Sequence, residues 1–186
     1  DYWGWNKEVQ FLANRGYAVF QPNFRGSTGY GNKLRLAGFR EWGGKMQDDI
    51  TDGVKHLIAE GIADAKRVGI YGASYGGYAT MAGLCFTPEL YRCGVNYVGV
   101  TDINLILKEY PLPKKIHDDI NAVMIADRSR DKDWIKSRSI QYNIDKVRAP
   151  VLMAYGMKDW RVPPKHGRIL KRALDRNNIP NKLIIK

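Results

Sequence analysis

Apolar residues along the chain follow two spacings, one typical of helices and one typical of buried strands. From Met46 to Glu60, Ile50, Val54 and Leu57 recur at helical spacing, and Gly61 is a stop signal. Short apolar runs bounded by turn residues indicate strands instead. The predicted helices are one ending near Gly16, Met46 to Glu60, residue 75 to about Cys85, Asp102 to about Ser137 with interruptions at Pro111 and Pro113, and Pro164 to Asn177. The predicted strands are Tyr17 to Phe20, Arg67 to Tyr71, Val95 to Val100, Pro150 to Tyr155 and Lys182 to Ile185.

These elements predict the fold class. Strands separated by helices, without repeats or linkers, indicate an α/β protein with a mostly parallel sheet and helices on both faces. A chain of 186 residues is long enough for one domain with a sizeable core.

The sequence Gly72-Ala73-Ser74-Tyr75-Gly76-Gly77 lies between a predicted strand and a predicted helix. This is a G-x-S-x-G turn, and its context is the one that a nucleophile elbow requires. The pattern nominates Ser74 as a nucleophile, because the sharp turn lifts the hydroxyl clear of the sheet. The backbone N–H of Tyr75 falls at the helix N-terminus, where it can stabilise an oxyanion.

Phosphate binding is the rival interpretation of a glycine-rich loop. The chain contains no G-x-x-x-x-G-K-[ST] sequence. Gly29-Tyr30-Gly31 fails the dinucleotide pattern, because Leu34 occupies the position of the third glycine. Nucleotide binding is therefore disfavoured.

Two aspartates follow predicted strands, where ligands bind in parallel sheets. A triad acid in this fold lies between the serine and the histidine in the chain, and Asp102 and Asp159 both lie after Ser74. Asp102 directly precedes a predicted helix and is expected to be its N-cap. Asp159 lies on a loop and is expected to be the acid.

No histidine follows the last predicted strand, which is where this fold places its general base. His56 precedes the elbow and is expected on a helix surface, and His117 precedes the predicted acid. His166 follows Asp159, but it begins a helix instead of following the last strand, so a structural or site-rim role is favoured over the base. The base is therefore expected beyond Lys186.

The charge and the cysteine content limit which partners and cofactors are expected. The formal net charge of +11 would suit an acidic partner, but Lys and Arg are dispersed, and the densest stretch, Lys165 to Arg176, has the pattern of an amphipathic helix. No nucleic-acid partner is therefore expected. Cys85 and Cys93 fit neither a disulfide framework nor a metal site, so no metal or other cofactor is expected.

A membrane association is not expected either, because the chain contains no run of 18 apolar residues. The first residues lack the pattern of a signal peptide, and the compartment stays open with the cytoplasm favoured.

Several ordered motifs together resemble the catalytic domain of the prolyl oligopeptidase family, particularly its acylaminoacyl-peptidase and dipeptidyl-peptidase branches. They are Asn23 to Gly31, Trp42-Gly43 with Asp48-Asp49, Gly72 to Tyr78, and Ala149 to Leu152 leading to Asp159-Trp160-Arg161-Val162-Pro163. The resemblance implies a partial α/β-hydrolase fold, with Ser74 as nucleophile, Tyr75 as oxyanion donor and Asp159 as triad acid. It implies cleavage of short peptides through an acyl-enzyme.

Three parts that this family usually has are absent from the 186 residues. They are an H-G-G-P-like oxyanion segment, a histidine loop after the last strand and an N-terminal β-propeller. The chain is therefore expected to be a single hydrolase domain, incomplete at both ends, with little turnover alone. The alternatives are a carboxylesterase, or a non-catalytic hydrolase domain. An exposed apolar sheet edge would favour a homo-oligomer.

Overall fold

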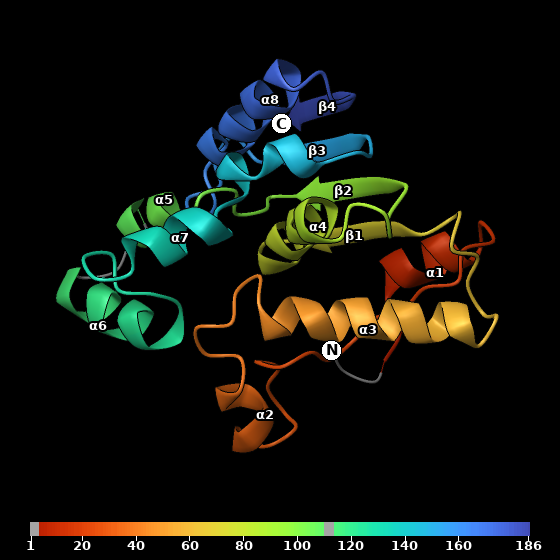
Figure 1. Ribbon diagram of the computed structural model, residues 1–186, viewed down its shortest axis with the longest axis horizontal. Helices are drawn as coiled ribbons and strands as arrows, with labels where there is room; N and C mark the ends of the chain where they lie inside the picture. The colour runs from red at the N-terminus through yellow and green to blue at the C-terminus, as the bar shows by residue number, and fades with distance from the viewer. Residues whose placement is uncertain (1–3, 110–113) are drawn as a thin grey trace.

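A four-stranded parallel sheet forms the centre of the protein in a computed structural model that describes residues 4–109 and 114–186 (Figure 1). The strands pair in the order β1-β2-β3-β4, and every pairing is parallel. The predicted parallel α/β fold is thereby confirmed. The strands are β1 (Gly69–Ala73), β2 (Cys93–Tyr97), β3 (Val151–Tyr155) and β4 (Asn181–Ile185).

Two helices, α4 (Tyr75–Phe86) and α8 (Lys165–Arg176), cover one face of this sheet. A Cβ on Gly94 of β2 would come within 2.6 Å of Leu84 of α4. One on Gly167 of α8 would come within 2.5 Å of the Tyr155 ring of β3. These close approaches leave the side chains between the layers buried, and the main core lies here.

The opposite face is covered less. The short helix α1 (Lys7–Ala13) reaches it where the Tyr71 hydroxyl donates a hydrogen bond to the Glu8 carboxylate, at 3.1 Å. Tyr97 and Leu152 lie on the same face and remain 46% and 38% exposed.

The helix α3 (Lys45–Ala59) runs beside α4 and ends before Gly61, whose φ of 71° suits glycine. This helix agrees with its prediction within one residue at each end. A short helix, α2 (Asn32–Leu36), precedes it and has no counterpart among the predicted elements.

The long excursion between β2 and β3 is helical, as predicted. It contains α5 (Ile103–Glu109), α6 (Lys114–Met124) and α7 (Lys132–Arg138), followed by 3₁₀ turns at Ile140–Tyr142 and Ile144–Lys146. Pro111 and Pro113, the predicted interruptions, lie outside the described residues. Figure 1 shows these helices grouped beyond the carboxyl ends of the strands, where chemistry is expected in such sheets.

Two strand predictions are wrong in part or in full. Tyr17 to Phe20 forms no strand, and Tyr17 and Phe20 are 63% and 43% exposed. A strand needs a neighbour for its backbone groups, and no described strand pairs with this segment. The strand predicted to reach Val100 ends at Tyr97, because Val98 turns the chain with a φ of 46°.

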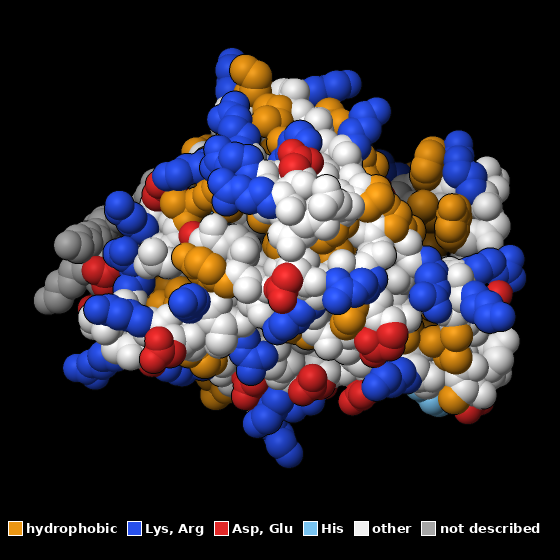
Figure 2. Space-filling model, turned by 45° about the horizontal axis from the view of Figure 1, so that its top comes forward, with side chains coloured by type: hydrophobic (Ala, Val, Ile, Leu, Met, Phe, Trp, Pro, Cys, Tyr) orange, Lys and Arg blue, Asp and Glu red, His pale blue; other side chains and the backbone are white. Residues whose placement is uncertain are grey.

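Basic side chains spread across the whole face shown in Figure 2, with acidic ones between them. The densest stretch of basic residues in the sequence, Lys165 to Arg176, forms α8 and includes Arg168, Lys171, Arg172 and Arg176. None of the described helices combines the length and apolar character that crossing a membrane requires.

Candidate active site

The turn from β1 into α4 forms a sharp elbow at Ser74. Ser74 has φ 56° and ψ −117°, a conformation that L-residues rarely adopt. Its N–H donates to the Tyr97 carbonyl of β2, at 3.0 Å, and the Tyr78 N–H donates to the Ser74 carbonyl, at 3.1 Å. The strained residue is thus held from both sides by the sheet and by the first turn of α4.

Glycines flank the serine because backbones meet there. A Cβ on Gly72 would lie 2.3 Å from the Gly76 carbonyl oxygen, so only glycine fits at this position. Gly77 approaches Gly99 equally closely, since its Cβ would lie 2.5 Å from the Gly99 Cα. The Asn96 Oδ1 accepts the Gly99 N–H at 2.8 Å and fixes that second contact.

The elbow presents two groups that can act on a carbonyl. The Ser74 side chain is exposed and lies on the wall of a pocket. The Tyr75 N–H is the first of α4 and donates to no acceptor among the described residues. A helix N-terminus favours negative charge, so this N–H is suited to an oxyanion.

Aromatic side chains fix the orientation of Tyr75 beside the serine. Its ring centroid lies 4.8 Å from that of Trp42, 5.5 Å from that of Phe24 and 5.8 Å from that of Tyr78. Burial, aided by the charge of Asp49, raises the pKa of the Tyr75 phenol well above its usual value. The phenol therefore stays neutral, and this ring forms an uncharged wall.

The loop that carries Phe24 is tied to α3 by an ion pair. The Arg25 guanidinium and backbone N–H both donate to the Asp49 carboxylate, the backbone bond at 2.9 Å. The Arg25 hydrogen bond holds the pKa of Asp49 below its usual value. Gly26 and Gly38 also come into close contact, because a Cβ on Gly38 would lie 2.5 Å from the Gly26 Cα.

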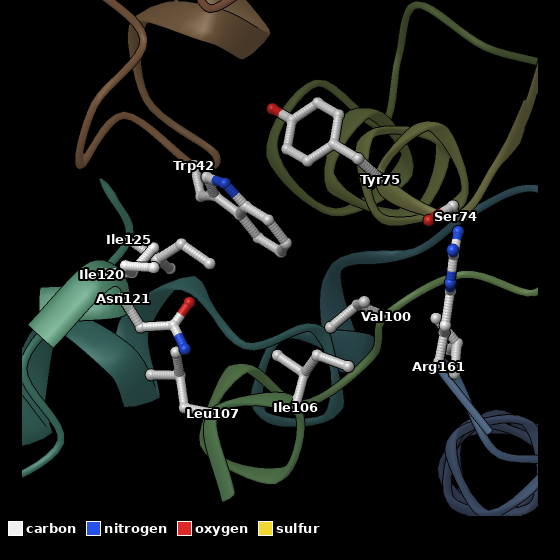
Figure 3. A pocket seen from close by; sticks show the side chains of 11 residues that line it. Trp42, Ser74, Tyr75, Val100, Ile106, Leu107, Ile120, Asn121, Ile125 and Arg161 are labelled. Atoms are coloured by element: carbon white, nitrogen blue, oxygen red, sulfur yellow. The ribbon is translucent and has the colours of Figure 1, made fainter. Parts of the chain in front are cut away.

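A pocket of about 390 Å³ opens beside Ser74 (Figure 3). Figure 3 shows Ser74 and Arg161 together at one end and Asn121 at the other. Between them the walls are mostly apolar. The remaining lining residues are Trp42, Tyr75, Val100, Ile106, Leu107, Ile120, Ile125 and Val162.

Asp159 lies on the loop after β3 that leads to this pocket. Its Oδ1 accepts the backbone N–H groups of Arg161 and Val162, both at 2.9 Å. Its Oδ2 has no hydrogen-bond partner among the described residues. One carboxylate oxygen thus fixes the loop, and the other is left available to a base.

Arg161 lies on the same loop, where an arginine could form a structural ion pair or contact a substrate carboxylate. Within the described part of the chain it forms no ion pair, and its guanidinium lies 5.0 Å from the ring centroid of Trp160. It points toward Ser74 at the mouth of the pocket. No carboxylate among the described residues therefore pairs with this guanidinium.

The histidines with described side chains do not meet Ser74 in the pocket. His56 is exposed on α3, as expected. His166 is fully buried, and its Nδ1 lies 3.2 Å from the Thr101 N–H. Burial lowers the pKa of His166 to about 4, so it is neutral near pH 7. His117 belongs to α6, and its side chain lies outside the described residues.

Asp102 is an N-cap, as predicted. Its Oδ1 accepts the Leu105 N–H at 3.2 Å in the first turn of α5, and its Oδ2 accepts from the Gln141 amide. Both oxygens therefore have structural partners, which leaves Asp159 as the candidate acid.

No group of three or more His, Cys, Asp or Glu residues in the described ranges has an arrangement that could hold a metal ion. Cys85 is buried and Cys93 exposed, and both are free thiols.

A strand, a strained serine and a helix that begins at once have the geometry of the nucleophile elbow found in α/β hydrolases. The sequence comparison gives the family: the model of the prolyl oligopeptidase family, peptidase S9, matches residues 3–186. The chain belongs to this family.

Named relatives support this family assignment. The chain is 40% identical to dipeptidyl aminopeptidase BIII of Pseudoxanthomonas mexicana over 182 residues, 97% of this chain and 26% of that protein. It is 30% identical to the acylamino-acid-releasing enzyme of Rattus norvegicus over 193 residues, 97% of this chain and 25% of that enzyme. The chain thus spans about a quarter of the length of these relatives.

Solved structures show the same fold. A puromycin-hydrolysing peptidase of Mycobacterium tuberculosis superposes with a TM-score of 0.82 at 27% identity, over 88% of this chain and 24% of that one. An acylaminoacyl peptidase in complex with Z-Gly-Gly-Phe-chloromethyl ketone gives 0.79 at 25% identity, over 88% and 26%.

Sequence reasoning missed the far wall of the pocket. This wall is lined by Ile106 and Leu107 of α5, by Asn121 of α6 and by Ile125, which directly follows α6. They fall within the predicted helical excursion, but helical spacing alone does not show which face turns toward the elbow. Trp42 was singled out only through the family motif.

Proposed function

We propose that this chain supplies the nucleophile, the acid and part of the oxyanion hole of a serine peptidase. The observation that carries the proposal is the strained Ser74 elbow, with its hydroxyl on the wall of the pocket. Beside it lies the Tyr75 N–H, which has no acceptor among the described residues. Named members of the family and its solved structures are peptidases, which agrees with this site.

The reaction is acyl transfer in two steps. The Ser74 Oγ attacks the carbonyl carbon of the scissile bond and gives its proton to a base, while the Tyr75 N–H stabilises the oxyanion. The amine leaves with a proton from that base, and water then attacks the acyl-enzyme and releases Ser74. The first product carries the new amine and the second the new carboxylate.

Asp159 is proposed as the acid that orients the base. A triad acid accepts the Nδ1–H of an imidazole and stabilises the imidazolium. The Oδ2 of Asp159, which has no hydrogen-bond partner in the described ranges, is available for this hydrogen bond, and its Oδ1 is held by the loop backbone. Among the histidines whose side chains are described, neither His56 nor His166 lines the pocket, so we expect little turnover from the 186 residues alone.

Short peptides are the proposed substrates, with the side chain before the scissile bond entering the pocket. The walls are mostly apolar and the volume is about 390 Å³, which suits a large side chain. The phenylalanyl inhibitor in the complex of the related acylaminoacyl peptidase is consistent with that choice.

The domain assignment and the oligomeric state are also proposals. Residues 1–186 are proposed as one part of an α/β-hydrolase domain, in line with the share of the relatives that they cover. The exposed Tyr97 and Leu152 on the less covered sheet face would favour self-association.

Parallel assays test the activity. Hydrolysis of an aminoacyl anilide, lost in Ser74→Ala and strongly reduced in Asp159→Asn, would support a peptidase. Hydrolysis of a short-chain aryl ester alone would favour a carboxylesterase, which uses the same elbow and acid. Turnover of neither, with a Ser74 that also fails to react with a fluorophosphonate, would favour a non-catalytic domain.

A further inference from the structure

One residue of the pocket stands out chemically from those around it. Asn121 is half-buried on α6, and its carboxamide faces the cavity beside Ile120 and Leu107 (Figure 3). Neither its Oδ1 nor its Nδ2 has a hydrogen-bond partner among the described residues. An amide in an apolar wall loses free energy unless a ligand or water satisfies it.

Polar side chains lie at the two opposite ends of the pocket. Ser74 and Arg161 lie together at the reacting end, and Asn121 lies at the other end. The side chains of Val100 and Ile106 lie between. A side chain that enters beside Ser74 therefore crosses an apolar stretch before its tip reaches the amide.

Arg40 ties the end of α6, just after Asn121, to the loop that carries Trp42. The Arg40 N–H donates to the Met124 carbonyl at 2.9 Å, and its guanidinium donates to the Ala122 carbonyl at 2.8 Å and to Asp131 at 2.6 Å. Arg40 precedes Trp42 by two residues, so one short loop holds the wall at Trp42 and the end of α6 together. The Asn121 carbonyl also accepts two N–H groups of the turn after α6, from Ile125 and Ala126, both at 2.8 Å.

We propose that Asn121 determines specificity by hydrogen-bonding the tip of the substrate side chain, and that the preferred residue before the scissile bond is tyrosine. This inference rests on the proposed function. A carboxamide offers one acceptor and two donors, and a phenol can both donate and accept. The tyrosine ring is long, rigid and apolar up to its hydroxyl, which matches an apolar pocket with a polar end.

Other long side chains match less well. The ammonium of lysine and the guanidinium of arginine would lose hydration in an apolar pocket whose described lining residues include no carboxylate. Methionine and leucine would leave the amide unsatisfied. Phenylalanine fills the same space as tyrosine but lacks the hydroxyl, so it isolates the contribution of Asn121.

The test measures binding rather than turnover. Acetyl-glycyl-tyrosinamide and acetyl-glycyl-phenylalaninamide are titrated into the protein by isothermal calorimetry. We expect the tyrosine ligand to bind about 3- to 10-fold more tightly, the value of one net hydrogen bond. In Asn121→Leu that preference disappears, while the phenylalanine ligand binds at least as well as before, which also shows that the variant is folded.

Asn32→Leu is the matched control, because it makes the same change at an exposed position on α2. It leaves the preference for tyrosine unchanged. Equal binding of the two ligands to the wild-type protein, or a preference that persists in Asn121→Leu, would overturn the role of Asn121.

A separate arm distinguishes this inference from the proposed function. In protein that includes the segment expected to supply the base, a small fluorophosphonate needs the Ser74 elbow and that base but no side-chain pocket. Labelling of Ser74 without binding of either dipeptide would reject the pocket as the side-chain site and leave the nucleophile intact. Binding with a tyrosine preference but no labelling would support the specificity site and count against the proposed nucleophile.

Discussion

The two faces of the sheet carry similar residues but differ in how they are covered. Met153 and Leu152 are neighbours on β3, and Met153 is 0% exposed under the helices, whereas Leu152 on the other face is 38% exposed. The elbow stands on the covered side, where α4 comes close enough to the strands to require glycine. Apolar residues alone therefore do not show which face of a strand is buried. The helices that cover one face determine this, and the elbow lies on the covered face.

The largest expected loss of stability comes from a substitution at the elbow, where two stretches of backbone lie in close contact. Gly72→Ala places a Cβ 2.3 Å from a backbone oxygen of α4, which cannot move as a side chain can. We expect a loss of about 4 kcal/mol or more in the free energy of unfolding, measured by urea denaturation. Gly76→Ala is the matched control, since its Cβ would meet nothing within 4 Å, and we expect no destabilisation. Equal losses in the two variants would show that the elbow is not closely packed.

The two neighbours on β3 compare the faces directly. Met153→Ala removes a fully buried side chain and is expected to cost about 2–4 kcal/mol. Leu152→Ala truncates an exposed side chain and is expected to cost less than about 1 kcal/mol. Denaturant titrations of both variants give the values. A large loss for Leu152→Ala would mean that something covers this face in solution, and sedimentation at two concentrations would show whether a second copy does so.

The ion pair between Arg25 and Asp49 has a pH-dependent effect. The pKa of Asp49 is lowered in the folded protein, so its contribution to stability is present at neutral pH and is lost as the pH falls through that lowered value. We expect Asp49→Asn to lower the Tm at pH 7 by about 2–4 °C. The difference from wild type should shrink as the pH falls below the usual carboxylate range of about 4. A difference that stays constant with pH would mean that the charge of Asp49 does not matter.

The smallest effect is expected in the segment from Tyr17 to Phe20. Tyr17→Ser changes a side chain that is 63% exposed and should alter stability by less than about 0.5 kcal/mol. Amide hydrogens of residues 18–20 should exchange quickly, whereas those of β2 and β3, which are paired on both sides, should be protected. Strong protection of residues 18–20 would show that the predicted strand forms after all.

The sequence predicted those parts of the molecule that depend on local chemistry. Ser74 could be placed on an elbow because the motif G-x-S-x-G adopts few other conformations between a strand and a helix. Asp102 could be assigned as an N-cap from its position directly before a helix. Tyr17 to Phe20 has the apolar pattern of a strand, but pairing depends on a neighbour that the pattern does not contain. Asn121 could not be placed, because its role arises from the turn that brings α6 back toward Trp42.

The most direct test of the central claim is the intact mass of the protein after exposure to a fluorophosphonate, with Ser74→Ala as the control. The account predicts one added phosphonyl group on wild-type protein that includes the segment expected to supply the base, and none on Ser74→Ala. Equal masses of that protein before and after exposure, or labelling that persists in Ser74→Ala, would contradict the assignment of Ser74 as the nucleophile.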